Sequence, residues 1–478
     1  MSGLPANKTK IVATIGPASQ SREVMEAMLR AGMNVARLNF SHGDFETHKR
    51  VIESLRAASA ATGHRLAIMA DLSGPKMRIG TFGVEKIELK NGQRFTLTTE
   101  EVVGDERRVS VSFDRLPQVV KAGDTLFLND GYVQLEVADI GGAAVECIVR
   151  VGGELRSRKG LNLPGIALGI DAFTERDRAC LAFALENGVD AVSQSFVESA
   201  ADIAAVRRAA RDLGHDPFII AKIERSRALE RLDEILEAAD GVMIARGDLG
   251  VEVPIEQIAV VQKDIMRRAN QRAKPVITAT QMLESMIEHR LPTRAEATDV
   301  ANAILDGTDC VMLSAESAVG SYPVEAVAML VKIAATVEPT RRRVSIGDLY
   351  RGLDVRERVR PEHLVALSVE TCLEYATPVA VVVPTLSGTA ARRMAMMHLP
   401  VWTIAVSARA QTCQALQFSY GVVPVYESCE PEIWNEYVRN WVRQENLPGQ
   451  FVMLIAGPSP THTERNHRME LIELGGQA

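Results

Sequence analysis

Residues 217–249 read PFIIAKIERSRALERLDEILEAADGVMIARGDL, and they predict a strand, a helix and a second strand in succession. The apolar runs FIIAKI and GVMIA are typical of buried strands, and residues 227–240 between them have helical spacing of apolar residues. A unit of this kind makes its two strands parallel and covers them with the helix. Charged residues stand where the strands end, namely Lys222 and Glu224 on the first and Asp248 after the second.

The same alternation of apolar runs and helical patterns continues on both sides of this unit. Including its own two strands, strands are predicted over residues 10–16, 34–41, 66–74, 190–196, 217–224, 241–250, 275–281 and 309–317. Each is followed, sooner or later, by a helical pattern. Eight such units favour a closed (β/α)₈ TIM barrel over an open doubly wound sheet.

Residues 73–160 interrupt the alternation. They lack helical periodicity and alternate apolar with polar residues, and Asn91-Gly92 and Asp130-Gly131 are typical of turns. We therefore expect an all-β domain inserted after the third strand. It would lie at the carboxyl-end mouth of the barrel, where it could close over a site as a lid.

A further α/β unit is predicted beyond residue 340, with a helical pattern over 362–376 and apolar strands over 379–384 and 401–407. The run Arg341-Arg342-Arg343 marks the change, and a solvated linker is the plain interpretation of the run. The expected domains are the barrel in two parts, 1–72 and 161–340, the lid, 73–160, and the C-terminal α/β domain, 341–478.

The charge and the apolar pattern exclude several classes of protein. The formal net charge of −7 argues against a broad nucleic-acid-binding face, which is usually basic. No apolar stretch is long enough for a membrane helix or a signal peptide. The six cysteines form no Cys-x-x-Cys pair, so we expect reduced thiols in a cytoplasmic protein.

Catalytic groups in such barrels lie at the carboxyl ends of the strands. The residues found there are Arg37, Asn39, Ser41, Asp71, Lys222, Glu224, Asp248, Thr280, Ser314 and Glu316. Glu224 and Asp248, from neighbouring strands, could hold Mg²⁺ or Mn²⁺. Lys222 faces the same way as Glu224 and would stabilise charge on a phosphoryl group or an enolate. The backbone amides of Gly247 and Asp248 could bind a carboxylate. Taken singly, each charged residue could also be part of a structural ion pair.

Longer segments carry a family resemblance. They are TKIVATIGPAS (9–19), NVARLNFSHG (34–43), DGVMIARGDLGVEVP (240–254), KPVITATQMLESM (274–286) and PTRAEATDVANAILDG (292–307). With these segments the chain resembles the pyruvate kinase family over nearly its whole length. The resemblance implies transfer of the phosphoryl group of phosphoenolpyruvate to ADP, giving ATP and pyruvate, and it fits a barrel, lid and C-terminal domain.

The resemblance also implies roles for single residues. Glu224 and Asp248 match the ligands of an essential divalent ion, and a second divalent ion would arrive with ADP. The groups that match substrate and catalytic positions are Arg37, Lys222, Gly247, Asp248, Thr280 and Ser314. Those that match nucleotide contacts are Asn39, His42, Arg78, Lys159 and Pro17. His42 could instead be a surface histidine, and Lys159 part of an exposed basic turn.

One departure concerns the monovalent cation that many family members need. Asn39, Ser41 and Asp71 match K⁺ ligands, but Lys76 stands where those members have a glutamate. An ammonium carries the same charge as K⁺ and can donate to nearby oxygens. We therefore expect that K⁺ is not required.

A second departure lies in the C-terminal domain. The loop with Thr385, Ser387, Gly388 and Thr389 resembles the phosphate loop of an effector site, and its hydroxyls suit phosphate oxygens. Members that bind fructose 1,6-bisphosphate often have a basic residue where this chain has Leu386. A sugar monophosphate, or no sugar phosphate at all, is therefore the expected effector, and a plain strand-to-helix turn is the alternative.

Two other functions stay open at this point. A lyase or aldolase acting on enolates could use the same metal and barrel, but it would not need Arg78 and Lys159. A non-enzymatic metabolite sensor would not need Lys222, Glu224 and Asp248. The resemblance further implies a homotetramer.

Overall fold

The computed structural model describes residues 4–341, 361–458, 464 and 466–475. Its centre is a closed barrel of eight parallel strands in the order β1-β16-β15-β14-β13-β12-β3-β2. The strands are β1 (Lys10–Thr14), β2 (Met33–Asn39), β3 (Ala67–Leu72), β12 (Ala191–Gln194), β13 (Phe218–Ile223), β14 (Gly241–Ala245), β15 (Val276–Ala279) and β16 (Cys310–Leu313). The predicted TIM barrel is confirmed.

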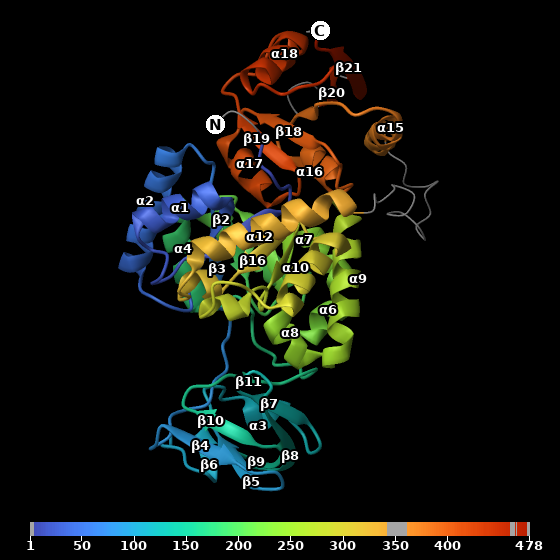
Figure 1. The fold of residues 1–478 in the computed structure, drawn as a ribbon. Helices are drawn as coiled ribbons and strands as arrows, with labels where there is room; N and C mark the ends of the chain where they lie inside the picture. Colours follow the sequence, from blue (N-terminus) through green and yellow to red (C-terminus); the bar gives the residue numbers. More distant parts are fainter. Residues whose placement is uncertain (1–3, 342–360, 459–463, 465, 476–478) are drawn as a thin grey trace.

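Helices cover the outside of the barrel (Figure 1). They are α1 (Arg22–Ala31), α2 (Phe45–Thr62), α4 (Glu175–Glu186), α5 (Ala200–Asp212), α6 (Ser226–Glu230), α7 (Leu232–Ala238), α9 (Ile258–Asn270), α10 (Arg294–Asp306) and α12 (Pro323–Val337). The single helix expected over 227–240 is two helices, because the chain leaves the helical conformation at Arg231. Two short helices, α8 (Arg246–Glu252) and α11 (Ala315–Ala318), follow β14 and β16 directly at the mouth.

The inserted domain has its own core, with Phe95, Leu97 and Leu135 fully buried. Its strands are β4 (Lys86–Leu89), β5 (Arg94–Thr98), β6 (Arg108–Ser110), β7 (Thr125–Leu128), β8 (Val133–Gly141), β9 (Ala144–Val151), β10 (Gly153–Arg156) and β11 (Leu161–Asn162). The expected boundary at residue 160 is too early, because β11 pairs with β7 and Leu168 belongs to the same core. The domain also contains one helical turn, α3 (Leu116–Val119), so it is not all-β.

The C-terminal domain lies at the end of the barrel opposite the inserted domain (Figure 1). Its sheet has the order β19-β18-β17-β20-β21 and is parallel except for β21. The elements are α15 (Pro361–Tyr375), β17 (Ala380–Pro384), α16 (Thr389–Ala395), β18 (Trp402–Ser407), α17 (Ala410–Ala415), β19 (Val422–Tyr426), α18 (Trp434–Gln444), β20 (Phe451–Ala456) and β21 (Arg468–Glu473). Of the Arg341–Arg343 run, the last two residues lie outside the described ranges.

Buried contacts join this domain to the base of the barrel. The Lys10 ammonium donates to the carbonyl oxygen of Val422 at 2.7 Å, and the Tyr420 amide donates to Asp309 at 2.9 Å. No helix in the described ranges is long and apolar enough to cross a membrane.

Candidate active site

A chain of buried charges crosses the mouth of the barrel. Arg37 donates from Nε and Nη2 to Oδ2 of Asp71 at 2.9 and 2.5 Å, and from Nη1 to Thr14 at 2.9 Å. Lys222 lies 3.4 Å from Oδ1 of Asp71 and 2.7 Å from Oε1 of Glu224. Three strand ends, those of β2, β3 and β13, therefore bring two cations and two carboxylates together, as expected.

The pairing fixes the charge states of these groups. Burial works to raise the pKa of Asp71, but Lys222 and Arg37 outweigh it and hold that pKa at about 2. Burial likewise works to lower the pKa of Lys222, and the charges of Asp71 and Glu224 outweigh it, so the pKa rises. Lys222 is therefore a permanent cation, and its buried charge can act on a ligand with little screening.

Glu224 and Asp248 are the pair that could hold a divalent metal. Glu224 is buried, and its Oε2 accepts from the amide of Phe196 at 2.8 Å. The pKa of Asp248 is raised to about 6, first by burial and then by the charge of Glu224. A divalent cation bound between the two carboxylates would offset the cost of burying Asp248 and its repulsion from Glu224. Carboxylate oxygens are hard donors, which suit Mg²⁺ or Mn²⁺.

The protein offers few ligands for such an ion. In the part of the chain that the structure describes, no three His, Cys, Asp or Glu side chains are grouped closely enough to form a cage. A two-carboxylate site leaves coordination positions for water or for substrate oxygens, as sites for Mg²⁺ at phosphorylated substrates commonly do.

The predicted carboxylate-binding groups lie beside these charges. Gly247 stands in the first turn of α8, and its amide donates to Oγ1 of Thr280 at 2.8 Å. Thr280 and Gln281 follow β15 with φ angles of 67° and 52°, a left-handed backbone that is strained for residues other than glycine. The Thr280 hydroxyl is thereby held against α8 rather than left on a free loop.

Ser314 follows β16 and is half-buried. Its amide donates to Oε2 of Glu316 at 2.7 Å, and Oε1 of the same carboxylate accepts from the amide of Leu283 at 3.0 Å. Glu316 thus ties the ends of β15 and β16 together. We find no hydrogen bond between Ser314 and Thr280 among the described residues.

The nucleotide candidates lie where the inserted domain joins the barrel. Arg78 forms an isolated β-bridge with Gly160 and donates to the carbonyl of Arg158 at 2.9 Å, so Lys159 is beside it. Burial lowers the pKa of His42, and the charges of Lys76 and Arg78 lower it further, which shows that these groups share one region.

Asn39 and Pro17 lie on the barrel side of that region. Asn39 accepts from the amide of Ser41 at 3.1 Å, and Pro17 is exposed after β1.

The four residues matched to a monovalent site lie on β2 and β3 and in the turns that follow these two strands. The Ser41 hydroxyl lies 2.9 Å from that of Ser73. Burial lowers the pKa of Lys76, as do the charges of Lys222 and Arg78, while Asp71 and Asp248 oppose the shift. The Lys76 ammonium makes no hydrogen bond or ion pair with the described residues, so it stands near the site without direct contact to Asn39 or Ser41.

Sequence reasoning missed two serines of the site. Ser195 accepts from Lys222 at 2.7 Å, and Ser193 donates to Asp71 at 2.7 Å. Both are buried, and they lie two residues apart at the end of β12, on one face of the strand. The sequence signal that could have identified them is their spacing of two residues in the strand DAVSQSF (190–196), which places both side chains on the same face.

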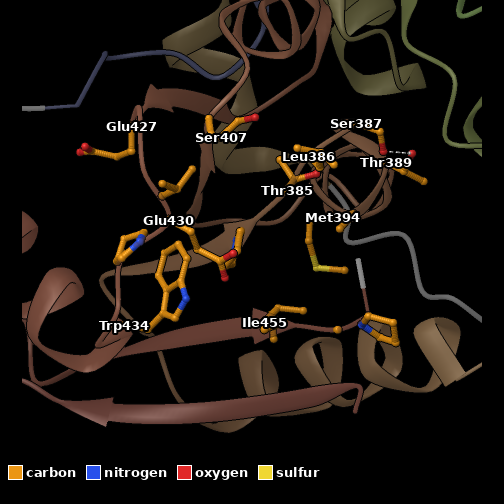
Figure 2. Close-up of a pocket in the computed structure, with 18 of the residues that line it drawn as sticks. Thr385, Leu386, Ser387, Thr389, Met394, Ser407, Glu427, Glu430, Trp434 and Ile455 are labelled. Carbon is orange, nitrogen blue, oxygen red and sulfur yellow. Dashed lines mark hydrogen bonds between the residues drawn. The ribbon is translucent and has the colours of Figure 1, made fainter. Parts of the chain in front are cut away.

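The effector-type loop lines a cavity of about 460 Å³ in the C-terminal domain (Figure 2). Thr385 accepts from the amide of Gly388 at 3.0 Å, and the hydroxyls of Ser387 and Thr389 lie 3.0 Å apart. Figure 2 shows Glu430 and Trp434 on the other side of the cavity from this loop.

Known proteins share both the fold and the sequence. The family model for the pyruvate kinase barrel domain matches residues 6–327, and that for the pyruvate kinase alpha/beta domain matches residues 362–466. A pyruvate kinase of Thermococcus litoralis is 46% identical over 434 residues, 91% of each chain. One from Thermotoga maritima is 39% identical over 458 residues, covering 94% of this chain and 96% of the relative.

A crystal structure of a pyruvate kinase from Cryptosporidium parvum superposes with a TM-score of 0.90 at 34% identity, covering 98% of this chain and 96% of that one. The site residues and these matches lead to one conclusion: the chain belongs to the pyruvate kinase family and is a kinase of glycolysis.

Proposed function

We propose that the protein transfers the phosphoryl group of phosphoenolpyruvate to ADP, giving pyruvate and ATP. The observation that carries the proposal is that Arg37, Lys222, Glu224 and Asp248 lie at one mouth of the barrel. The lid is on this side of the barrel (Figure 1). Phosphoryl transfer depends on positioning and charge neutralisation, and these groups supply both.

Each residue has a defined task in this reaction. Lys222 would neutralise charge on the moving phosphoryl group and on the enolate oxygen, and Arg37 would hold the phosphate with its remaining N–H groups. Gly247 and Thr280 would orient the substrate carboxylate. Glu224 and Asp248 would hold Mg²⁺, which when bound offsets negative charge on the substrate oxygens.

The second half of the reaction delivers a proton to enolpyruvate. Thr280 is the proposed source of this proton, through water, and Ser314 follows the next strand of the barrel.

For ADP, we propose Asn39, His42, Arg78 and Lys159 as phosphate contacts and Pro17 as the surface for the adenine. A second divalent ion would travel with ADP.

A coupled assay for pyruvate formation tests the reaction. Activity should require phosphoenolpyruvate, ADP and Mg²⁺ together, and a chelator should abolish it reversibly. Asp248→Asn and Glu224→Gln should each lower kcat by roughly 10²-fold or more, since each removes a metal ligand. Undiminished turnover in excess chelator, or cleavage of an enolate substrate without ADP, would refute the assignment.

We also propose that K⁺ is not required, because Lys76 supplies a positive charge close to Asp71. The test is the steady-state rate in K⁺-free buffer with tetramethylammonium as the counter-ion. Lys76→Glu should create activation by K⁺, whereas Lys76→Met should be slow with and without K⁺. A large activation of the unmodified protein by K⁺ would contradict the idea.

For the C-terminal cavity we propose a sugar monophosphate as effector. The loop offers hydroxyls for one phosphate, while Glu427 and Glu430 line the cavity and disfavour a second one. Calorimetry should show tighter binding of glucose 6-phosphate than of fructose 1,6-bisphosphate. The reverse order would overturn the proposal.

A homotetramer in the cytoplasm is the proposed state of the protein. All six cysteines are free thiols, which suits a reducing compartment. Sedimentation at micromolar concentration should give the mass of four chains, and a monomer under those conditions would count against it.

A further inference from the structure

Arg225 is a buried cation that the reaction described above does not use. It follows Glu224 directly, so its side chain leaves the backbone on the face opposite that carboxylate. Only 2% of the side chain is exposed. Its Nη2 donates to the carbonyl of Ile166 at 2.9 Å and lies 3.4 Å from that of Leu163. These carbonyls belong to the segment that returns from the lid to the barrel, which we call the return segment (residues 163–170).

Two carboxylates flank Nε of Arg225, that of Glu198 at 3.4 Å and one that comes from α8. Glu252 is the last residue of that helix, its side chain is 1% exposed, and its Oε1 lies 3.6 Å from Nε of Arg225. Its Oε2 accepts from the amide and hydroxyl of Ser226 at 3.2 and 3.1 Å. Nε of Arg225 and Oε1 of Glu252 have no hydrogen-bond partner in the described ranges, so their interaction is an ion pair without a hydrogen bond.

The two ends of α8 have different neighbours. Gly247 and Asp248 at its start belong to the candidate active site. Val251, near its end, packs against Gly131 in a turn of the lid. A Cβ added to Gly131 would lie 3.4 Å from Cγ2 of Val251. A cavity of about 570 Å³ separates this end of α8 from lid residues including Phe127 and Tyr132. The end of α8 is therefore a part of the barrel that faces and contacts the lid.

We propose that Arg225 is a positioning residue that fixes the return segment to α8 and thereby sets the affinity for ADP. The proposal rests on the proposed function in one respect, the placement of the ADP phosphates at Arg78 and Lys159 on the lid side. The groups assigned to phosphoenolpyruvate all lie on the barrel. Loss of the Arg225 contacts should therefore weaken ADP binding and leave phosphoenolpyruvate binding nearly unchanged.

The variant that tests this is the double substitution Arg225→Met with Glu252→Gln. Removing both charges together avoids leaving Glu252 buried and unpaired, which would destabilise the protein by itself. The control is Arg227→Met, because Arg227 pairs with the same Glu198 as Arg225 but makes no hydrogen bond to the described residues 163–170. Arg225→Lys is the conservative variant and keeps the charge without the paired N–H groups.

The expected result is a rise of about 10-fold in KM for ADP, with kcat and KM for phosphoenolpyruvate within about twofold. Hydrogen exchange of residues 161–170 should be faster in the double variant and in Arg225→Lys, and unchanged in Arg227→Met. An unchanged KM for ADP would overturn the proposal. So would a double variant in which kcat and both KM values worsen together while hydrogen exchange of residues 161–170 stays slow. If the unmodified protein shows no transfer from phosphoenolpyruvate to ADP, the proposed function fails, and the exchange data still decide whether Arg225 holds the return segment.

Discussion

The ammonium of Lys222 is held by oxygens from three strand ends, those of Ser195, Asp71 and Glu224. Such a preorganised cation acts on developing charge without having to move. Lys222→Met keeps the length of the side chain and removes the charge, so kcat should fall by about 10²–10³-fold. The coupled assay measures this, and Lys263→Met, at an exposed ion pair with Asp306, is the matched control. Equal losses in both variants would contradict the role.

Asp309, at the base of the barrel, makes stability depend on pH. Burial raises its pKa to about 7, although amides of Tyr420 and Val276 and the charge of Arg341 oppose the shift. An acid with a raised folded-state pKa binds more protons when folded than when unfolded between its two pKa values. The free energy of unfolding should therefore decrease as pH rises from about 4 to 7, with a limiting slope of about 1.4 kcal/mol per pH unit for one proton.

Asp309→Asn removes this titration. Urea unfolding between pH 5 and 7 should show a shallower decline in stability for the variant than for the unmodified protein. Identical pH profiles would show that Asp309 is charged throughout this range. Burial lowers the pKa of Lys10 to about 8 and the charge of Asp309 opposes that shift, so the pH range is kept below 7, where Lys10 is mainly charged in the unmodified protein.

At the scale of elements, the sequence predicted what depends on local chemistry. Ser21 caps the start of α1 and Gly32, with a left-handed backbone, ends it, and both are local features of the sequence. The break at Arg231 was missed, since no glycine or proline marks it. The end of the lid was also missed, because β11 is only two residues long and is specified by pairing with β7.

In the candidate site, too, local sequence pattern predicted some features and tertiary packing decided others. Strand periodicity placed the side chains of Lys222 and Glu224 on one face, and barrel closure brought Asp71 near them. The hydrogen bond from the Gly247 amide to the Thr280 hydroxyl could not be predicted, because it depends on a left-handed backbone at Thr280, which is not a glycine. Contacts of this kind are fixed by tertiary packing rather than by propensity.

The close approach of Gly16, which follows β1, to Ala318 of α11 gives a prediction about how these two elements pack. A Cβ on Gly16 would lie 2.6 Å from the carbonyl oxygen of Ala318 and 2.9 Å from its Cβ, so Gly16→Ala must push α11 away. This helix carries Glu316, which accepts from the Ser314 amide. We expect a loss of about 1–3 kcal/mol in stability and a lower kcat. Gly141→Ala, with nothing within 4 Å and no left-handed φ, should change neither.

Across the whole molecule, the lid and the C-terminal domain occupy opposite ends of the barrel (Figure 1). The C-terminal domain shares buried hydrogen bonds with the barrel, through Lys10 and Asp309, while the lid has a separate core. Ligand binding at the mouth should therefore stabilise the barrel and the C-terminal domain as one cooperative unit, because neither can unfold without exposing that interface.

The tryptophans allow this coupling to be measured. All three, Trp402, Trp434 and Trp441, lie in the C-terminal domain, so their fluorescence follows the unfolding of that domain alone. Mg²⁺ with oxalate, a dianion similar to enolpyruvate, at roughly 100 times its Kd should add about 2.7 kcal/mol to the stability of the liganded unit. The melting midpoint seen by tryptophan should then rise by roughly 2–5 °C, although the ligand binds at the far end of the barrel. Asp248→Asn should abolish the rise. A midpoint that stays constant while the circular dichroism of the barrel shifts would show that the two domains unfold independently.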